Sequence, residues 1–189
     1  ISFGSGGSEM LYKNVKENKY VKQTEIMGKV FLIKDKIKNI EWELSDETKN
    51  IGIYTCYKAT YSREVEEVDF SSFSTVDSKE NEVKQTKKMK TIVTTAWYTP
   101  QIPISNGPRE FGGLPGLILE LRQGKLTIVC SEVILNPSEK TTITAPKKGK
   151  KVTQKEFNII QDKKSKELME SFKSKRGANI NGIQIKIGG

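Results

Sequence analysis

The residues of this chain that could do chemistry are its two cysteines, its carboxylates and its lysines, because the 189 residues include no histidine. This absence excludes Ser-His-Asp and Cys-His nucleophilic machinery, and it excludes zinc sites of the Cys/His kind. Carboxylate pairs or a lysine base could still move protons, but no spacing singles out such a pair. The sequence therefore predicts no catalytic residue, no metal site, no cofactor and no enzymatic activity.

The two cysteines, Cys56 and Cys130, lie in strand-like segments at residues 53–59 and 126–133. In an oxidising compartment they could form a disulfide across a sheet. The alternative is two separate buried thiols, since an unbonded cysteine often packs as a small core residue. The sequence favours free thiols, and it leaves Cys56–Cys130 as the one disulfide that could form.

Positive charge is concentrated near the C-terminus. The net charge is +9, and residues 147–176 supply +7 of it, from eleven Lys and Arg against four acids. Such a segment can contact nucleic acid or an anionic membrane, whereas the ordinary interpretation is a solvated Lys-rich face. No aromatic stacking pattern is interleaved with these lysines, so we predict no nucleic-acid partner. No apolar run reaches the ~18–20 residues that span a bilayer, so no transmembrane segment is predicted.

Four residues near the middle of the chain are candidate partner contacts, because aromatic residues and Arg beside a Pro/Gly-rich loop often anchor partners. The alternative for the aromatic residues is that they fill the core of a sheet. These candidates are Trp97, Tyr98, Arg109 and Phe111.

Alternation of apolar and polar residues predicts short strands over the first two thirds of the chain. The polar segment 45–50 is predicted to be a turn, and segment 62–90 a long polar hairpin excursion that is peripheral to the core. The predicted strands cover residues 10–15, 19–25, 29–33, 41–44, 52–61, 91–99, 117–121 and 125–135.

One helix is predicted at residues 154–175. Thr153 and Glu156 form the Thr-x-x-Glu pattern of a capping box, and apolar residues recur at helical spacing after them. Segment 1–9 is predicted to be flexible and segment 183–187 to be a short strand. The predicted fold is a single domain, residues 1–189, of the mainly β (α+β) class: a curved antiparallel sheet or half-barrel with one C-terminal helix.

A Gly-Leu-Pro-Gly-Leu-Ile motif occupies residues 113–118. Pro115 followed by Gly116 is typical of a type II turn, in which Gly116 would need a positive φ. The motif lacks the Lys-Ser/Thr ending of a phosphate loop, so it does not indicate a bound nucleotide. We therefore predict a structural role for its six residues, Gly113, Leu114, Pro115, Gly116, Leu117 and Ile118.

The same hexapeptide, letter for letter, is the signature of the GLPGLI family, which this chain resembles over roughly residues 10–189. The surrounding Ala96-Trp97-Tyr98-Thr99, Ile102-Pro103 and Gly107-Pro108-Arg109-Glu110-Phe111 strings are also similar to the family pattern, as are Trp42 and the segment 51–59. Proteins of this family occur in Bacteroidetes-type Gram-negative bacteria and are typically exported. They are often encoded near TonB-dependent outer-membrane transport components, and their biochemical role is not established.

The resemblance implies a periplasmic or otherwise exported protein. Family members usually begin with a signal peptide, whereas this chain opens at Ile1-Ser2-Phe3-Gly4. We therefore expect a mature or trimmed chain, from which N-terminal strands could be missing.

The function predicted from these observations is that of a cell-envelope interaction or binding protein. The resemblance implies a link to TonB-dependent outer-membrane transport, with an outer-membrane transport protein or another envelope protein as the partner. Two alternatives remain open. One is a carrier of a small apolar ligand or peptide, which would need an apolar cavity. The other is a carboxylate-based hydrolase, against which the missing histidine argues.

Overall fold

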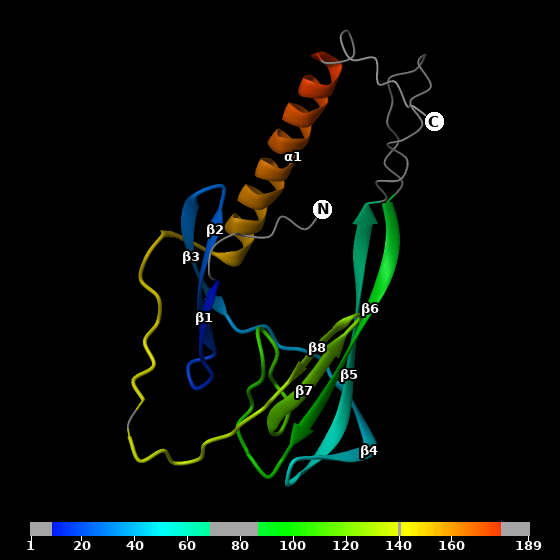
Figure 1. Cartoon of the computed structure of the whole chain (residues 1–189), viewed down its shortest axis with the longest axis vertical. Helices are drawn as coiled ribbons and strands as arrows, with labels where there is room; N and C mark the ends of the chain where they lie inside the picture. The colour runs from blue at the N-terminus through cyan, green and yellow to red at the C-terminus, as the bar shows by residue number, and fades with distance from the viewer. Residues whose placement is uncertain (1–8, 69–86, 140, 179–189) are drawn as a thin grey trace, which may run out of the picture. The chain divides into compact units, whose positions relative to one another are not determined.

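The computed structural model describes residues 9–68, 87–139 and 141–178, in which nine strands and one helix are found (Figure 1). The chain divides into two compact units. Unit 1 comprises Ile1–Ile37 and Thr141–Gly189, and unit 2 comprises Lys38–Lys140. Each unit contains one sheet and its own hydrophobic core.

The sheet of unit 1 has the strand order β1-β2-β3-β9. β1 (Met10–Asn14), β2 (Lys19–Ile26) and β3 (Lys29–Lys36) form an antiparallel meander. β9 (Lys150–Val152) comes from far along the chain and pairs with β3 in parallel. A three-residue strand thus completes this sheet, immediately before the helix begins.

The helix α1 (Gln154–Ala178) covers the sheet of unit 1 near its own first turns. The Phe157 ring meets the Phe31 ring edge to face, with the centroids 5.5 Å apart. The capping box forms as expected. The Glu156 N–H donates to Thr153 Oγ1 at 3.2 Å, and the Thr153 N–H donates to Glu156 Oε2 at 2.7 Å.

Two further hydrogen bonds attach the start of α1 to the sheet. The Gln154 N–H donates to the Asp35 carboxylate at 3.0 Å, and the Tyr20 hydroxyl donates to Gln154 Oε1 at 2.9 Å. Burial, together with the nearby Asp35 charge, raises the pKa of Tyr20 to about 12. The phenol therefore stays protonated and remains a donor.

The sheet of unit 2 has the strand order β4-β5-β6-β7-β8, so every strand pairs antiparallel with its neighbour in the chain. The central pair, β5 and β6, is the longest, and its register runs from Tyr57 opposite Tyr98 to Val68 opposite Lys87. The strands are β4 (Glu43–Ile51), β5 (Tyr54–Val68), β6 (Lys87–Thr99), β7 (Leu117–Gln123) and β8 (Leu126–Val129).

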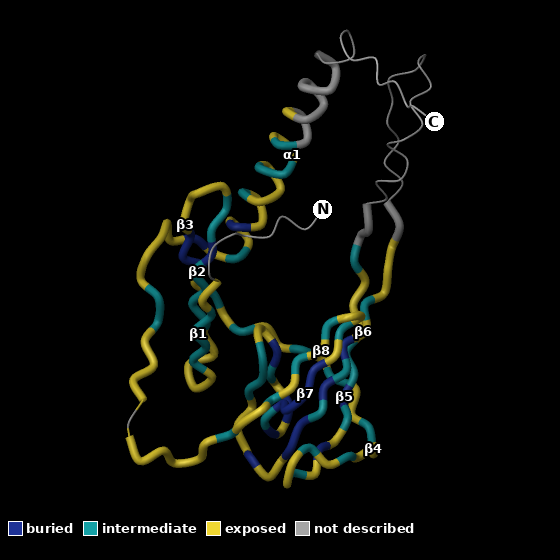
Figure 2. The backbone as a smooth tube through the Cα atoms, in the orientation of Figure 1, coloured by how far each residue is buried: buried dark blue, intermediate teal, exposed yellow. Residues whose placement is uncertain are grey.

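The irregular segment between β6 and β7, residues 100–116, covers one face of this sheet. It contributes the buried side chains of Phe111 and Leu114 to a cluster that includes Ala59 and Leu121 from the strands. Trp42 fastens the segment, since its Nε1–H donates to the Gly112 carbonyl at 2.9 Å. Figure 2 shows this burial concentrated along the strands of unit 2 and, in unit 1, on β3 and the first turns of α1.

The predicted mainly β class with one C-terminal helix is confirmed, and α1 begins at the predicted residue. The prediction of one sheet is wrong, because the described residues form two sheets. The turn predicted at 45–50 is also wrong. Those residues continue β4 through a β-bulge, and the chain turns at Gly52, which has a φ of 58°. Polar residues are tolerated there because β4 is an edge strand.

Other predicted boundaries moved, and some lie outside the described residues. The last predicted strand of unit 2, 125–135, ends at Val129, and β9 was not predicted. The ends of segment 62–90 belong to the paired strands β5 and β6, whereas residues 69–86 lie outside the described residues. Residues 1–8 and the strand predicted at 183–187 lie outside them too, and the single-domain assignment stays a prediction.

Candidate functional site: the charged face of unit 2

The two faces of the unit 2 sheet differ in character. Ala96 and Leu121 pair across β6 and β7 on the core face, whereas their chain neighbours Trp97 and Glu120 pair on the opposite face because alternate strand residues point to opposite sides. We call this opposite face the charged face. It carries Lys49, Cys56, Lys58, Trp97, Glu120 and Arg122.

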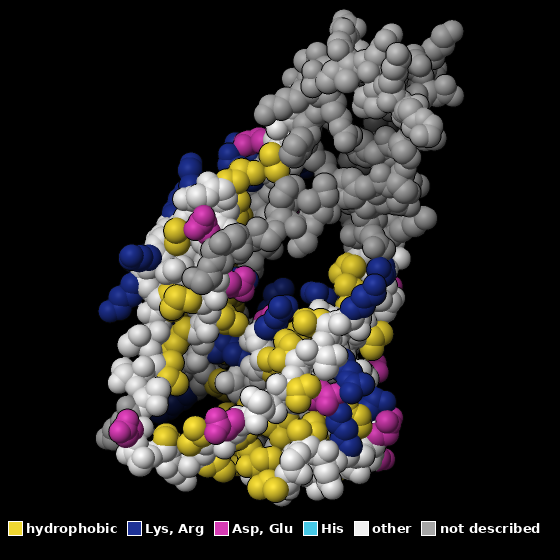
Figure 3. All heavy atoms as spheres, in the orientation of Figure 1, with side chains coloured by type: hydrophobic (Ala, Val, Ile, Leu, Met, Phe, Trp, Pro, Cys, Tyr) yellow, Lys and Arg dark blue, Asp and Glu magenta, His cyan; other side chains and the backbone are white. Residues whose placement is uncertain are grey.

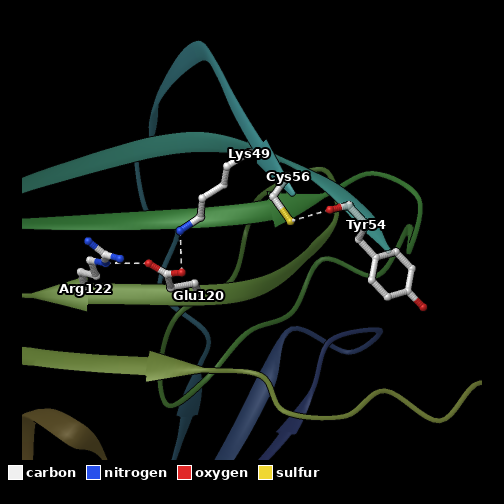
Figure 4. Close-up of polar contacts among 5 residues, drawn as sticks. All are labelled: Lys49, Tyr54, Cys56, Glu120 and Arg122. Atoms are coloured by element: carbon white, nitrogen blue, oxygen red, sulfur yellow. Dashed lines mark hydrogen bonds and ion pairs between the residues drawn. The ribbon is translucent and has the colours of Figure 1, made fainter. Parts of the chain in front are cut away.

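Glu120 is the centre of the charged face (Figure 4). Its side chain is only 8% exposed, yet it is paired with two cations. Lys49 Nζ lies 2.5 Å from Oε2, and Arg122 Nε lies 2.6 Å from Oε1. A buried carboxylate is tolerated only when it is paired and hydrogen-bonded, and these two contacts meet that requirement.

The protonation state of Glu120 follows from the same contacts. Burial alone raises the pKa of the carboxyl, but the hydrogen bonds and charges of Lys49 and Arg122 together outweigh it, so the pKa is lowered. Glu120 is therefore ionised at neutral pH. An ionised carboxylate held by two cations is a poor proton donor and a weak base. Glu120 is therefore better suited to holding Lys49 and Arg122 in place than to acid–base catalysis.

Lys49 also contacts Trp97. Its Nζ lies 4.5 Å from the centroid of the indole ring, within the range of a cation–π interaction. Lys49 belongs to the edge strand β4, so its side chain extends over the charged face to reach Glu120 on β7, as Figure 4 shows. The indole of Trp97 is half-buried beneath this ammonium group.

Cys56 lies on the same face and is fully buried. Burial raises the pKa of its thiol more than the nearby Lys49 lowers it, and Sγ contacts the Tyr54 carbonyl at 3.8 Å. A thiol with a raised pKa is not an activated nucleophile.

Cys56 and Cys130 are both unbonded in the structure. Cys56 is on β5, and Cys130 follows β8, three strand spacings away across the sheet. At ~4.8 Å per spacing this separation is about 14 Å, well above the ~7 Å limit for a disulfide. The arrangement of the strands disfavours the pairing that the sequence left open.

The four predicted partner contacts are not brought together. Tyr98 and Phe111 are 6% and 5% exposed and belong to the core of unit 2, so their assignment as contacts is wrong. Their apolar rings fill the space between the sheet and segment 100–116. Trp97 is half-buried on the charged face, and Arg109 is exposed in the loop with a φ of 51°.

Sequence reasoning missed Lys49, Glu120 and Arg122. The sequence does contain a feature that indicates Glu120, because it is the one charged residue within the apolar run Leu117–Leu121 of β7. No such feature indicates Lys49, since it lies in the polar segment 45–50 that was predicted to be a turn. Its role depends on an edge strand that reaches across its neighbours.

The motif at 113–118 is structural, but for a different reason from the one predicted. Gly116 does not have a positive φ, whereas Gly113 has a φ of 86°. At Gly116 the constraint is space, because an added Cβ would lie 2.2 Å from the Thr99 carbonyl oxygen. Pro115 forms a tight turn in which the Gly116 N–H donates to the Leu114 carbonyl at 2.8 Å.

The motif thus allows the chain to pass directly against the end of β6. Ile118 follows at 3% exposure and its N–H donates to the Asn106 carbonyl at 3.0 Å. The hexapeptide fixes the cover of the core, on the face of the sheet opposite the charged face.

Within the described ranges, no group of three or more Cys, Asp or Glu could hold a metal ion. In the same part of the chain, no helix is long and apolar enough to cross a membrane.

Comparison with known protein families matches part of the chain. Residues 42–120 match the model of a family described as "Protein of unknown function (Porph_ging)", which is fewer than half of the 189 residues. The match begins at Trp42, ends at Glu120 and lies entirely within unit 2. Searches of curated proteins and of solved structures found no match.

Proposed function

We propose that this chain is a protein of the GLPGLI family that is located in the periplasm. We further propose that it binds a protein partner in the cell envelope through the charged face of unit 2. The observation that carries the proposal is the arrangement around Arg122. Its Nε is fixed by the buried Glu120, while 59% of its side chain is exposed. Trp97 lies beside Glu120 in register on the same face.

This arrangement suits recognition because the guanidinium is already oriented. An arginine held by a buried carboxylate loses less side-chain freedom on binding than a free one, and its planar fork matches carboxylates on a partner. Trp and Arg are also the residue types that contribute most to protein interfaces. The edge strand β4 brings Lys49 to the same place, so three strands converge on one contact surface.

The proposed location and the proposed link to TonB-dependent transport rest on the resemblance to the GLPGLI family. The hexapeptide, Trp42 and the 96–111 strings that carry the resemblance all lie within the segment matched by the family model. Fractionation of the native producing cells tests the location, since the proposal expects the protein in the periplasmic fraction.

Photo-crosslinking in the producing cells tests the contact surface. A photoreactive residue at Thr127, which is exposed in register with Arg122, is expected to capture one discrete partner. The same residue at the exposed Arg63 of β5, on the other face of the sheet, is the control. Arg122→Gln should abolish capture at Thr127. It also removes one of the two cations paired with Glu120, so a modest loss of thermal stability is expected and the variant must be tested at a temperature at which it is folded.

Equal capture at both positions, or capture that survives Arg122→Gln, would contradict the proposed surface. Arg122→Lys sharpens the result. It keeps the charge but loses the planar fork, so we expect it to restore capture only weakly.

A further inference from the structure

The two units carry very different charges. Unit 1 has 19 Lys and Arg against 8 Asp and Glu, a net +11, whereas unit 2 has 13 against 15, a net −2. The +9 of the chain is thus a property of unit 1. Of its 19 basic residues 18 are Lys and one is Arg.

The acids of unit 1 are too few to balance its lysines, and most of them already have a partner within the unit. Asp35 accepts the Gln154 N–H, and Glu156 forms the capping box of α1. Glu9, Glu17 and Glu167 each pair with one lysine. The lysines therefore outnumber the carboxylates that remain to neutralise them.

The outer side of α1 displays part of this excess. Lys155, Ile159, Lys163 and Lys166 recur at spacings of three and four residues, so they share one side of the helix, roughly opposite Phe157 and its contact with the sheet. All four are exposed, and Ile159 is 61% exposed. Figure 3 shows Lys side chains gathered along α1.

The turn between β2 and β3 lies beside this helix, because Ile26, the last residue of β2, packs against the same cluster as Phe157. The charge of Lys29 contributes to lowering the pKa of Glu167, after the Lys164 hydrogen bond and the charges of Lys164 and Lys163. Met27 at this turn is 57% exposed and has a φ of 49°. An exposed apolar side chain therefore lies near the lysines of the helix.

We infer that unit 1 docks on the surface of an anionic phospholipid bilayer through α1 and the β2–β3 turn. This goes beyond the proposed function, which concerns unit 2 and a protein partner. Lysines attract a negatively charged headgroup layer from a distance, and exposed apolar residues among them enter the interface. Nucleic acid is disfavoured because no pattern of stacking aromatics is interleaved with the lysines and unit 1 has only one arginine.

Vesicle co-sedimentation of the full chain tests this inference. We expect binding to vesicles of phosphatidylcholine with 30% phosphatidylglycerol, no binding to pure phosphatidylcholine, and loss of binding in high salt. Changing Lys155, Lys163 and Lys166 to Gln should weaken partitioning on the order of 100-fold, since three surface lysines are removed. The matched control removes three exposed charges from unit 2, at Lys38, Arg63 and Lys125, and should weaken it far less.

Three outcomes overturn the inference: equal weakening by both triple variants, no binding to anionic vesicles, or binding to duplex DNA with no binding to vesicles. Met27→Ser should lower vesicle binding several-fold without changing net charge, and an unchanged affinity counts against insertion of the turn. Arg122→Gln should leave vesicle binding intact. Failure of the lipid proposal is therefore distinguishable from failure of the proposed function of unit 2.

Discussion

Units 1 and 2 each cover one face of a sheet, but they do so in different ways. In unit 1 the cover is a helix, whose contact with the sheet is between side chains such as Phe157 and Phe31. In unit 2 the cover is an irregular segment, whose backbone at Gly116 passes against the backbone at Thr99. A helix satisfies its own hydrogen bonds, whereas an irregular segment must find partners outside itself, as Trp42 provides at Gly112.

The difference predicts where each unit is vulnerable. Removing buried side-chain atoms lowers the free energy of unfolding in proportion to the atoms removed. Unit 1 should therefore be destabilised by truncation of the side chains between α1 and the sheet. Where one backbone packs directly against another, no side chain can move aside to make room. Unit 2 should therefore be destabilised by the addition of a single methyl group at Gly116. Both tryptophans, Trp42 and Trp97, belong to unit 2, and α1 belongs to unit 1. Tryptophan fluorescence and helical circular dichroism can therefore follow the two units separately.

The largest effect is expected for Gly116→Ala. The new Cβ would lie 2.2 Å from the Thr99 carbonyl oxygen, so segment 100–116 must move away from the sheet. We expect a loss of about 4 kcal/mol in the stability of unit 2, measured by denaturant unfolding with tryptophan fluorescence. Gly124→Ala is the control. That residue has a φ of 57° and open space, so it should cost only about 1 kcal/mol. Similar values for both variants would show that close approach is not the constraint.

Phe157→Ala should come next, at about 3 kcal/mol, because it removes a buried ring that packs against Phe31. The helical circular dichroism signal should melt earlier while tryptophan fluorescence reports an unchanged unit 2. Ile159→Ala, at an exposed position of the same helix, is the control and should be nearly neutral. A simultaneous shift of both signals would mean that the two units unfold as one.

Glu120→Gln should destabilise unit 2 by about 2 kcal/mol, because Lys49 and Arg122 lose the charge that compensates them. The value is below the ~3–5 kcal/mol typical of breaking a buried ion pair, since Arg122 is 59% exposed and solvent screens it. Denaturant unfolding followed by tryptophan fluorescence measures it. Glu64→Gln, at an exposed position of β5, is the control. A neutral result for Glu120→Gln would show that the cluster contributes nothing to folding.

The pH dependence of unit 2 should depend on the same carboxyl. The pKa of Glu120 is lowered on folding from an ordinary value of 4.5. Its contribution to stability is therefore complete above about pH 4.5 and is lost as the pH falls through the lowered folded pKa. Comparing the unfolding of the parent protein and Glu120→Gln between pH 6 and pH 3 is expected to show a steeper loss for the parent. Parallel curves would assign the acid sensitivity to other groups.

The smallest effect is expected for Thr153→Ala, which removes the hydroxyl of the capping box at the start of α1. The loss should be about 1 kcal/mol and confined to the helical signal. Thr153→Ser keeps the hydroxyl and should behave like the parent. If Thr153→Ala changed tryptophan fluorescence instead, the assignment of α1 to an independent unit would be wrong.

By itself, the sequence determined the features that depend on residues close together in the chain. Alternation located most of the strands, and Thr153 and Glu156 located the start of α1 to the residue. The meander of unit 2 could be predicted from the sequence for the same reason, since each of its strands pairs with the next one along the chain. The absence of histidine was equally visible.

Only the tertiary structure decided what depends on residues far apart. β9 is a strand because β3 offers it an edge, and three residues carry no periodicity of their own. Gly116 is required because segment 100–116 passes against Thr99, which no local pattern encodes. The cluster of Lys49, Glu120 and Arg122 exists because strands from opposite parts of one sheet place their charges together. Such contacts are fixed by sheet register and curvature, which arise only when the whole sheet has formed.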